Sequence, residues 1–133
     1  METQLQVSVV TPVQSLVTDT FTQVVAPSVC GQVTILPQHT PLLCNLAAGV
    51  VQLGPAAAAQ RYFVSGGFME VAHDRVSILA ESAQRTSEIN VAEAQTALRA
   101  AQAQLLPLQP QDPTYESTAR RVDELQQKIA ATK

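Results

Sequence analysis

The spacing of hydrophobic residues changes near Glu88, and this change constrains the fold more than any other feature of the sequence. Up to about Thr86, apolar runs recur at intervals of roughly eight to twelve residues, which is typical of a β-sandwich or barrel. Beyond Glu88 the period changes from two residues to about 3.6, the period of an α-helix. The sequence therefore predicts a β + α chain with two domains: a β-sandwich at residues 1–86 and a C-terminal antiparallel hairpin of two helices at residues 87–133.

Alternation of apolar and more polar residues supports the β region, most clearly at residues 5–10 (LQVSVV). Tight connections are predicted at residues 28–31, 66–67 and 73–74, where Ser, Gly, His and Asp stand between apolar runs. Further strands are predicted at residues 21–27 (FTQVVAP), 32–36 (QVTIL), 49–53 (GVVQL), 61–65 (RYFVS), 68–72 (FMEVA) and 75–80 (RVSILA).

Two helices are predicted from the second period. In the first helix, Asn90 is placed to cap the N-terminus with Glu93 as its capping-box partner, and the prolines that follow end the helix near Leu106. The second helix is predicted to begin with Asp112 as the N-cap and Pro113 in the first turn. Helical spacing gives each helix an apolar face, formed by Val91, Ala94, Leu98, Ala101 and Leu105 in the first and by Tyr115, Val122, Leu125 and Ile129 in the second.

Charge and length exclude several kinds of partner and site. The chain has eight Lys and Arg against eleven Asp and Glu, for a net charge of −3. Its scattered basic residues form no stripe that would neutralise phosphates, so nucleic acid is not a predicted partner. A chain of 133 residues is too short for an active-site cleft between two full domains. It has no run of about 18 apolar residues and no secretion signal at its start, which predicts a soluble, non-secreted protein.

The cysteines and histidines do not suggest a metal site. Cys30 and Cys44 are far apart in sequence and form no CxxC motif, and His39 and His73 belong to no ligand cluster. We therefore predict no metal and no other cofactor. Reduced thiols are the predicted state in an intracellular protein, but the spacing also allows a disulfide.

No catalytic group of residues emerges from the sequence. His39 lacks a nucleophile and an orienting acid nearby, and Ser65 does not lie in a Gly-x-Ser-x-Gly nucleophile elbow. Gly31 is not part of a glycine-rich phosphate-binding motif. An active site is therefore not predicted. The alternative is a stand-alone β-sandwich enzyme or small-ligand protein that uses His39.

Three segments resemble one known family. GQVTILPQHTPLL at residues 31–43 is similar to the G-x-[LIV]-G-[IV]-[LY]-P-x-H-x-P-[LI] segment of the ε subunit of F-type ATP synthases, the counterpart of the mitochondrial δ subunit. YFVSGGFMEV at residues 62–71 and VSILAESA at residues 76–83 continue the resemblance in the same order. Thr34 and Gln38 depart from the residues usual in the family, and we expect local repacking around them.

The resemblance implies a non-catalytic subunit of the central stalk, the rotor of the proton-translocating enzyme. In this family a β-sandwich of about ten strands binds the γ subunit and the c-ring, and so helps to couple proton flow to ATP synthesis. Carried over by position, contacts with γ are expected at Ser8, Val9, His39 and Thr40, and contacts with the c-ring at Ser28, Val29, Cys30, Gly31 and Gln32.

The helical hairpin has further roles in this family. In some bacterial members an I-D-x-x-R-A motif binds ATP, and the matching residues here are Ile89, Asn90, Glu93 and Ala94. A glutamate near a triphosphate repels it, so we predict weak or absent ATP binding. In many bacteria the hairpin reaches the α/β catalytic head and inhibits ATP hydrolysis, a role that this sequence leaves open.

The resemblance also implies where the protein is found. We expect a peripheral membrane protein on the cytoplasmic face of the bacterial inner membrane. The alternatives are the stromal face of the thylakoid membrane and the matrix face of the mitochondrial inner membrane.

Overall fold

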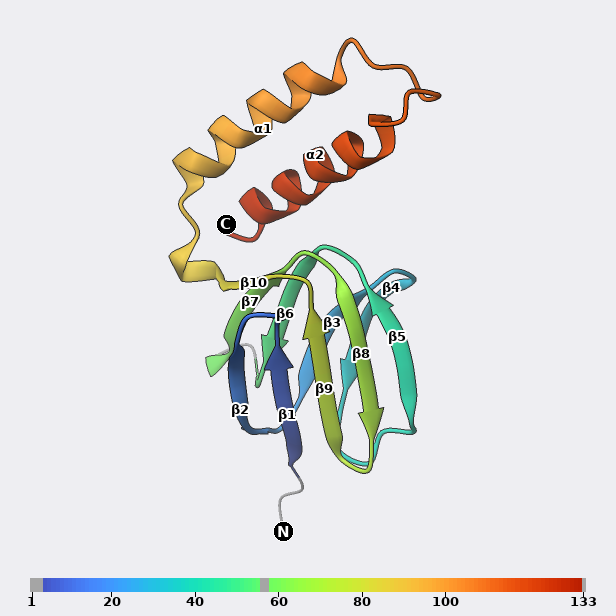
Figure 1. The fold of residues 1–133 in the computed structure, drawn as a ribbon. Coiled ribbons are helices and arrows are strands. Elements are labelled where there is room, and N and C mark those ends of the chain that lie inside the picture. Colours follow the sequence, from blue (N-terminus) through green and yellow to red (C-terminus); the bar gives the residue numbers. More distant parts are fainter. Residues whose placement is uncertain (1–3, 56–57, 133) are drawn as a thin grey trace. The chain divides into compact units, whose positions relative to one another are not determined.

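The structure is a computed structural model that describes residues 4–55 and 58–132. It divides into two compact units, with the boundary between Arg85 and Thr86 (Figure 1). The first unit, here called the β domain, contains the strands β1 (Leu5–Val10), β2 (Ser15–Phe21), β3 (Val24–Ser28), β4 (Gly31–Ile35), β5 (Leu42–Leu46), β6 (Gly49–Leu53), β7 (Gln60–Val64), β8 (Gly67–Ala72), β9 (Arg75–Ala80) and β10 (Ala83–Arg85).

These strands form one sheet that folds back on itself. The strand order is β10-β7-β6-β3-β5-β8-β9-β1-β2, and β4 pairs with β3 outside this path. β3 and β5 share a single registered pair, Ser28 with Leu46, and the sheet bends there. In Figure 1 the strands β1, β9, β8 and β5 therefore lie in front of β6, β3 and β4. This curled sheet of ten strands confirms the predicted β-sandwich.

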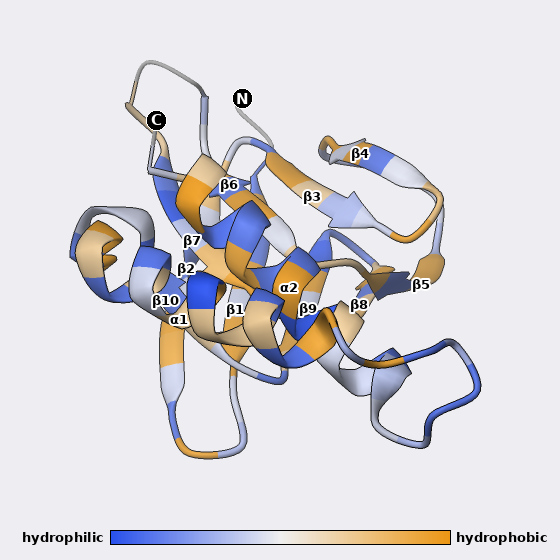
Figure 2. Ribbon diagram, turned by 90° about the horizontal axis from the view of Figure 1, so that it is seen from above, coloured by the Kyte–Doolittle hydropathy of each residue, from blue (hydrophilic) through white to orange (hydrophobic). Residues whose placement is uncertain are grey.

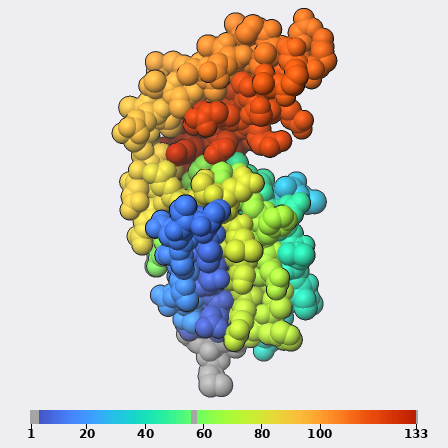
Figure 3. Space-filling model, viewed as in Figure 1, coloured from blue at the N-terminus to red at the C-terminus, as the bar shows by residue number. Residues whose placement is uncertain are grey.

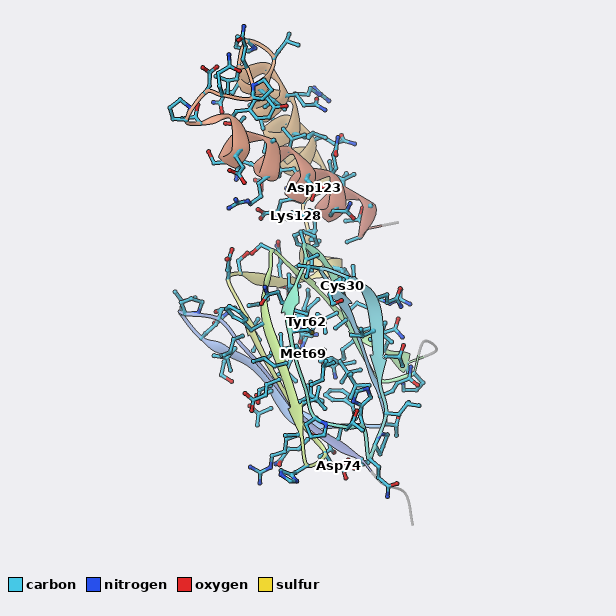
Figure 4. The ribbon with its side chains drawn as sticks, turned by 90° about the vertical axis from the view of Figure 1, so that its right-hand side faces the viewer. Cys30, Tyr62, Met69, Asp74, Asp123 and Lys128 are labelled. Carbon is cyan, nitrogen blue, oxygen red and sulfur yellow. The ribbon has the colours of Figure 1, made fainter. Side chains whose placement is uncertain are left out.

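Side chains from the two layers meet in a common core. Leu5, Val7 and Val9 of β1 are fully buried, and the residues between them lie on the outer face, as the alternation predicted. Tyr62 on β7 and Met69 on β8 belong to the same core (Figure 4). Burying an apolar side chain of this size contributes about 1.5–3 kcal/mol to folding, so this core holds the layers together.

The sequence did not predict β2, β5 or β10. β2 lies at the end of the strand order, and Val17 is its only buried residue. An edge strand of this kind shows little apolar alternation. β5 follows Pro41 directly, where prolines indicate a loop, and β10 has only three residues.

The turn between β8 and β9 is confirmed as a tight two-residue connection. His73 and Asp74 have φ values of 51° and 59°, and Ala72 pairs with Arg75 on either side of them. Two successive residues with positive φ are what a type I′ hairpin turn requires, because its twist matches that of the flanking strands.

The second unit contains the 3₁₀ helix η2 (Thr86–Glu88) and the helices α1 (Val91–Leu105) and α2 (Tyr115–Ala130). The side chain of Asn90 accepts a hydrogen bond from the Glu93 backbone N–H at 3.1 Å, which confirms the predicted N-cap of α1. Ala94 and Ala101 are the buried residues of α1, and Leu125 is the buried residue of α2. Figure 2 shows hydrophobic and hydrophilic residues in turn along α2.

The predicted start of α2 is wrong by two residues. The N-cap is Thr114 and not Asp112. The Asp112 carboxylate accepts a hydrogen bond from the Gln109 backbone N–H at 2.8 Å, and its carbonyl accepts one from Tyr115 at 3.1 Å. Asp112 therefore closes the turn before the helix, so its side chain does not reach the first helical N–H groups.

Candidate partner-binding surfaces

The turn between β3 and β4 is built around the side chain of Ser28. The Ser28 hydroxyl donates to the Gly31 carbonyl at 2.6 Å and accepts from the Cys30 backbone N–H at 3.2 Å. Ser28 is buried, whereas Val29 and Cys30 are exposed at the tip. Gly31 has φ of 124°, a conformation that other residues rarely adopt. The turn therefore presents an apolar tip on a fixed base.

The same turn is tied to β5. The Val29 backbone N–H donates to the Asn45 carbonyl at 3.0 Å, and the Ala47 N–H donates to the Pro27 carbonyl at 2.8 Å. These two bonds lie on either side of the pair formed by Ser28 and Leu46. The residues predicted to contact the c-ring all belong to this turn and its edges; they are Ser28, Val29, Cys30, Gly31 and Gln32. Ser28 differs from the others because its buried side chain supports the turn from inside.

The loop between β4 and β5, residues 36–41, is held by the turn between β8 and β9. The Gln38 backbone N–H donates to the Asp74 carboxylate at 2.6 Å, and Gln38 itself has a positive φ of 67°. The Asp74 carbonyl accepts from the Gln6 N–H at 2.8 Å. Asp74 therefore connects the start of β1 to the loop that carries His39, a role that its sequence position alone did not reveal.

His39 is half-buried, and its ring makes a local contact. Nδ1 lies 2.6 Å from the Thr40 carbonyl oxygen. Because a carbonyl oxygen only accepts, Nδ1 carries the hydrogen, and Nε2 of the neutral ring remains an acceptor. The His39 backbone N–H donates to the Leu36 carbonyl at 3.1 Å. This geometry holds the ring in one orientation, which suits recognition of a hydrogen-bond donor.

The early strand brings only one of its two predicted contact residues to the surface. Ser8 is half-buried and lies on the outer face of β1. Val9 has 0% exposure and points into the core. Successive residues of a strand face opposite sides of the sheet, so the outer side of β1 belongs to Ser8. The γ contact at Val9 stays a prediction.

The outer face around Ser8 carries exposed apolar side chains. Phe68 is 54% exposed and Leu79 is 56% exposed, and they form a cross-strand pair. Val10 is registered with Leu79 on the other side. These three residues line a shallow hollow of about 390 Å³. Figure 3 shows β1, β9, β8 and β5 as one continuous surface, coloured blue, yellow-green, green and teal.

A further apolar side chain on this face belongs to β5. Leu43 is 69% exposed and pairs with Glu70 of β8, which pairs with Ser77 of β9. Ser77 is registered with Ser8. We call the surface formed by Ser8, Val10, Leu43, Phe68 and Leu79 the outer apolar face. Exposed apolar side chains that cluster in this way mark protein interaction sites.

The two predicted contact regions lie at opposite ends of the β domain. Figure 4 places Cys30 at one end and Asp74 at the other. The loop with His39 and Thr40 is attached to the Asp74 end through Gln38. The structure therefore does not bring the predicted γ and c-ring residues into one site.

The residues that match the ATP-binding motif have structural roles. Ile89 and Ala94 are buried. Asn90 caps α1, and Glu93 is exposed in the first turn of that helix. The cap explains why an amide is tolerated here, since Asn and Asp are both good N-cap residues.

The described part of the chain offers neither a cluster of metal ligands nor a helix suited to span a membrane. Within residues 4–55 and 58–132, no three His, Cys, Asp or Glu side chains gather in a way that could hold a metal ion. None of the described helices has both the length and the apolar character that a membrane span needs.

Comparison with known proteins identifies the family. A family model described as "ATP synthase, Delta/Epsilon chain, beta-sandwich domain" matches residues 4–86. The ATP synthase epsilon chain of Lawsonia intracellularis is 39% identical over 106 residues, which are 80% of each chain. The ATP synthase epsilon chain 2 of Syntrophotalea carbinolica is 35% identical over 117 residues, 88% of this chain and 85% of that one. The chain therefore belongs to the family of ATP synthase delta and epsilon chains, and it is a subunit of the F-type enzyme complex.

Solved structures share the fold of the whole chain. A chain of the mitochondrial ATP synthase of Euglena gracilis, from an assembly of OSCP, F1 and c-ring, has a TM-score of 0.85 and 20% identity. The match covers 98% of this chain and 82% of that one. A chain from the central stalk and c-ring of the Tetrahymena thermophila mitochondrial ATP synthase has a TM-score of 0.67 and 16% identity, and covers 99% and 98% of the two chains.

Proposed function

We propose that this subunit transmits torque as a non-catalytic part of the rotor, with γ bound to the outer apolar face and the c-ring bound to the turn between β3 and β4. The observation that carries the proposal is that one tightly packed domain carries both an exposed apolar face and a turn with an exposed apolar tip. A rigid body with two binding regions can pass rotation from one partner to the other. It requires no active site of its own, and no cofactor.

The proposed γ contact combines apolar area with fixed polar groups. Phe68 and Leu79 supply the exposed apolar area, and Ser8 lies in the same layer of strands. The Nε2 atom of His39 supplies an acceptor at the Asp74 end, beside Thr40. Interfaces of this composition gain most of their affinity from the buried apolar centre.

The γ contact is tested with purified γ and variants of the full chain. We expect Leu79→Glu to weaken γ binding by at least about tenfold, because a carboxylate would be buried without a partner. Thr34→Glu is the matched control, since Thr34 is exposed on β4 in the other layer. Equal affinities of the two variants would rule out the outer apolar face as the γ contact.

A second experiment addresses the proposed c-ring contact. Val29 is 62% exposed at the tip of the turn, so Val29→Glu is expected to fold normally and to bind γ. Binding of the γ complex to purified c-rings should then fall, and ATP synthesis by reconstituted vesicles should fall with it. Unchanged binding and synthesis would place the c-ring contact elsewhere.

For nucleotide, we propose that the hairpin binds ATP weakly or not at all. Glu93 is exposed beside the N-cap Asn90, where its charge would repel a triphosphate. Isothermal titration of ATP into the wild-type chain should give no measurable heat of binding at millimolar nucleotide. The double variant Asn90→Asp, Glu93→Arg tests whether the family motif restores binding. Tight binding by the wild type would contradict the proposal.

The hairpin is also proposed to contact the α/β catalytic head and to regulate ATP hydrolysis. Its exposed basic residues Arg120 and Arg121 suit an acidic surface. In complexes assembled with a chain that lacks residues 90–133, ATP hydrolysis should rise above that of the full-length complex. A hydrolysis rate that does not change would argue against regulation.

We further propose that the protein is peripheral to the cytoplasmic face of a bacterial inner membrane. The epsilon chains of Lawsonia intracellularis and Syntrophotalea carbinolica, both bacterial, support this location. Thylakoid and mitochondrial membranes are the alternatives. Immunogold labelling of the source cells distinguishes them.

A further inference from the structure

The connection between β1 and β2, residues 11–14, is built like the turn between β3 and β4. The Thr11 hydroxyl donates to the Gln14 carbonyl at 3.2 Å and accepts from the Gln14 backbone N–H at 3.3 Å. The Ser28 hydroxyl likewise donates to the carbonyl three residues later, that of Gly31. Within residues 4–55 and 58–132, Thr11 and Ser28 are the only buried threonine or serine. Each connection is therefore fixed from inside by one buried hydroxyl group.

Each connection also presents one apolar side chain at its tip. Val13 is 87% exposed and Val29 is 62% exposed. Neither residues 11–14 (TPVQ) nor residues 28–32 (SVCGQ) contain a charged side chain. Pro12, whose ring fixes its backbone φ, directly precedes Val13. Because the backbone under each valine is already ordered, a partner can bind it without the entropy cost of ordering a loop.

Strand register places the two connections at the same end of the β domain (Figure 1). One row of registered residues crosses β3, β5, β8 and β9, and it consists of Ser28, Leu46, Gly67 and Ala80. β1 runs parallel to β9 with Val10 registered to Leu79, so Thr11 continues β1 at the level of Ala80. Neighbouring strands are about 4.8 Å apart, so the path from β3 to β1 along the curled sheet is roughly 19 Å. The two tips are therefore separate points on one end of the domain.

We propose that the connection between β1 and β2 is a second contact with the c-ring, which holds the β domain at Val13 as well as at Val29. This inference rests on the proposed function, because it takes the turn between β3 and β4 as the first contact. Two uncharged valine tips at one end of the domain suit the same kind of surface. A ring of identical subunits repeats its surface, so two of its copies can each engage one tip.

The other candidate occupant is γ, because Thr11 and Pro12 line the hollow on the outer apolar face. The described residues that line this hollow do not include Val13. Val13 instead extends past the last residue of β1, as Val29 extends past the last residue of β3. This shared placement favours the c-ring as the partner of Val13.

Two contacts also suit a domain that transmits rotation. A partner held at a single tip can pivot about it, whereas two separate tips on a rigid end fix the orientation of the domain. The second contact forms within a complex that the first has already joined, so it forms at a high effective concentration. Loss of either tip therefore removes the gain in affinity that comes from two-point attachment.

The test measures binding of the complex of the full chain with γ to purified c-rings. Val13→Glu is expected to weaken this binding by at least about tenfold, because a carboxylate would be buried without a partner. Leu106→Glu is the matched control, since Leu106 is 86% exposed but lies at the end of α1 in the second unit. The melting temperature of Val13→Glu and its affinity for γ should equal those of the wild type.

A second variant tests the support beneath Val13. Thr11→Val keeps the size of the buried side chain but removes the hydroxyl that holds Gln14. Hydrogen exchange at the Gln14 N–H should accelerate, and binding to c-rings should fall by at least about threefold, although Val13 is still present.

The outcomes separate this inference from the proposed function. If Val29→Glu weakens binding to c-rings and Val13→Glu does not, the second contact is overturned and the proposed function stands. If Val13→Glu weakens binding of γ instead, the connection belongs to the γ contact and the inference is overturned. If neither variant weakens binding to c-rings, the inference and the proposed c-ring contact both fail.

Discussion

Asp74 joins three segments that are remote in sequence. Its carboxylate accepts a hydrogen bond from the Gln38 N–H, and its carbonyl accepts one from the Gln6 N–H. Its own φ of 59° completes the turn after β8. Asp is among the residues that tolerate this left-handed conformation. The orientation of His39 therefore depends on a side chain in another hairpin.

We predict that Asp74→Gly frees the loop at residues 36–41 without unfolding the domain. Glycine accepts the positive φ but offers no carboxylate to the Gln38 N–H, so hydrogen exchange at Gln38 should accelerate. The free energy of unfolding should change by no more than about 1 kcal/mol. Asp74→Asn is the control, because its side-chain oxygen can still accept the bond. Equal exchange in both variants would show that the carboxylate does not hold the loop.

Gly67 and Gly31 provide a second comparison between single residues. Gly67 has φ of 139°, and a Cβ there would collide with the Leu79 carbonyl, whereas Gly31 has φ of 124° and open space around it. We predict that Gly67→Ala destabilises the chain by at least about 4 kcal/mol. Gly31→Ala should destabilise the chain by about 1–3 kcal/mol only, because it adds backbone strain without a collision. Urea denaturation measures both, and a larger loss for Gly31→Ala would contradict the account.

Among the elements, α1 depends most visibly on a single cap. Its buried residues are alanines, which bury little apolar area, so local terms carry more of its stability. We predict that Asn90→Ala destabilises α1 by about 1 kcal/mol. Asn90→Asp should retain the helix, because a carboxylate also accepts from Glu93 and interacts well with the helix N-terminus. Hydrogen exchange along α1 measures the effect, and unchanged exchange in Asn90→Ala would mean that the cap contributes nothing.

At the scale of the whole molecule, the division into two folding domains is itself a prediction. The core cluster of the β domain contains residues from Leu5 to Ala80. A fragment of residues 1–86 is therefore expected to unfold cooperatively on its own. Denaturation monitored by tyrosine fluorescence would reveal this through Tyr62, and a non-cooperative transition would show that the hairpin is required.

Assembly should also alter the oxidation of Cys30. The proposed c-ring contact includes this residue, so oxidised glutathione should react more slowly with the assembled complex than with the free chain. Equal rates would count against the c-ring contact at this turn.

The sequence by itself determined the periodic parts of this protein. Alternation fixed the inward side of β1, and the change of period near Glu88 separated strands from helices, because repeated burial of one face leaves a repeated pattern. The Asn90 cap and the turn at His73 and Asp74 were equally predictable, since both depend on neighbouring residues alone. The edge strand β2 was not, because it buries only Val17.

Only the tertiary structure decided which residues of the candidate surfaces come together. The side chain of Val9, a predicted γ contact, lies in the core. Asp74 was predicted only as part of a tight turn, but it also holds the loop of His39. Val10, Leu79 and Phe68 come together only because β1 is registered against β9 and β9 against β8. Such contacts depend on strand order and register across the sheet, and local sequence carries no record of either.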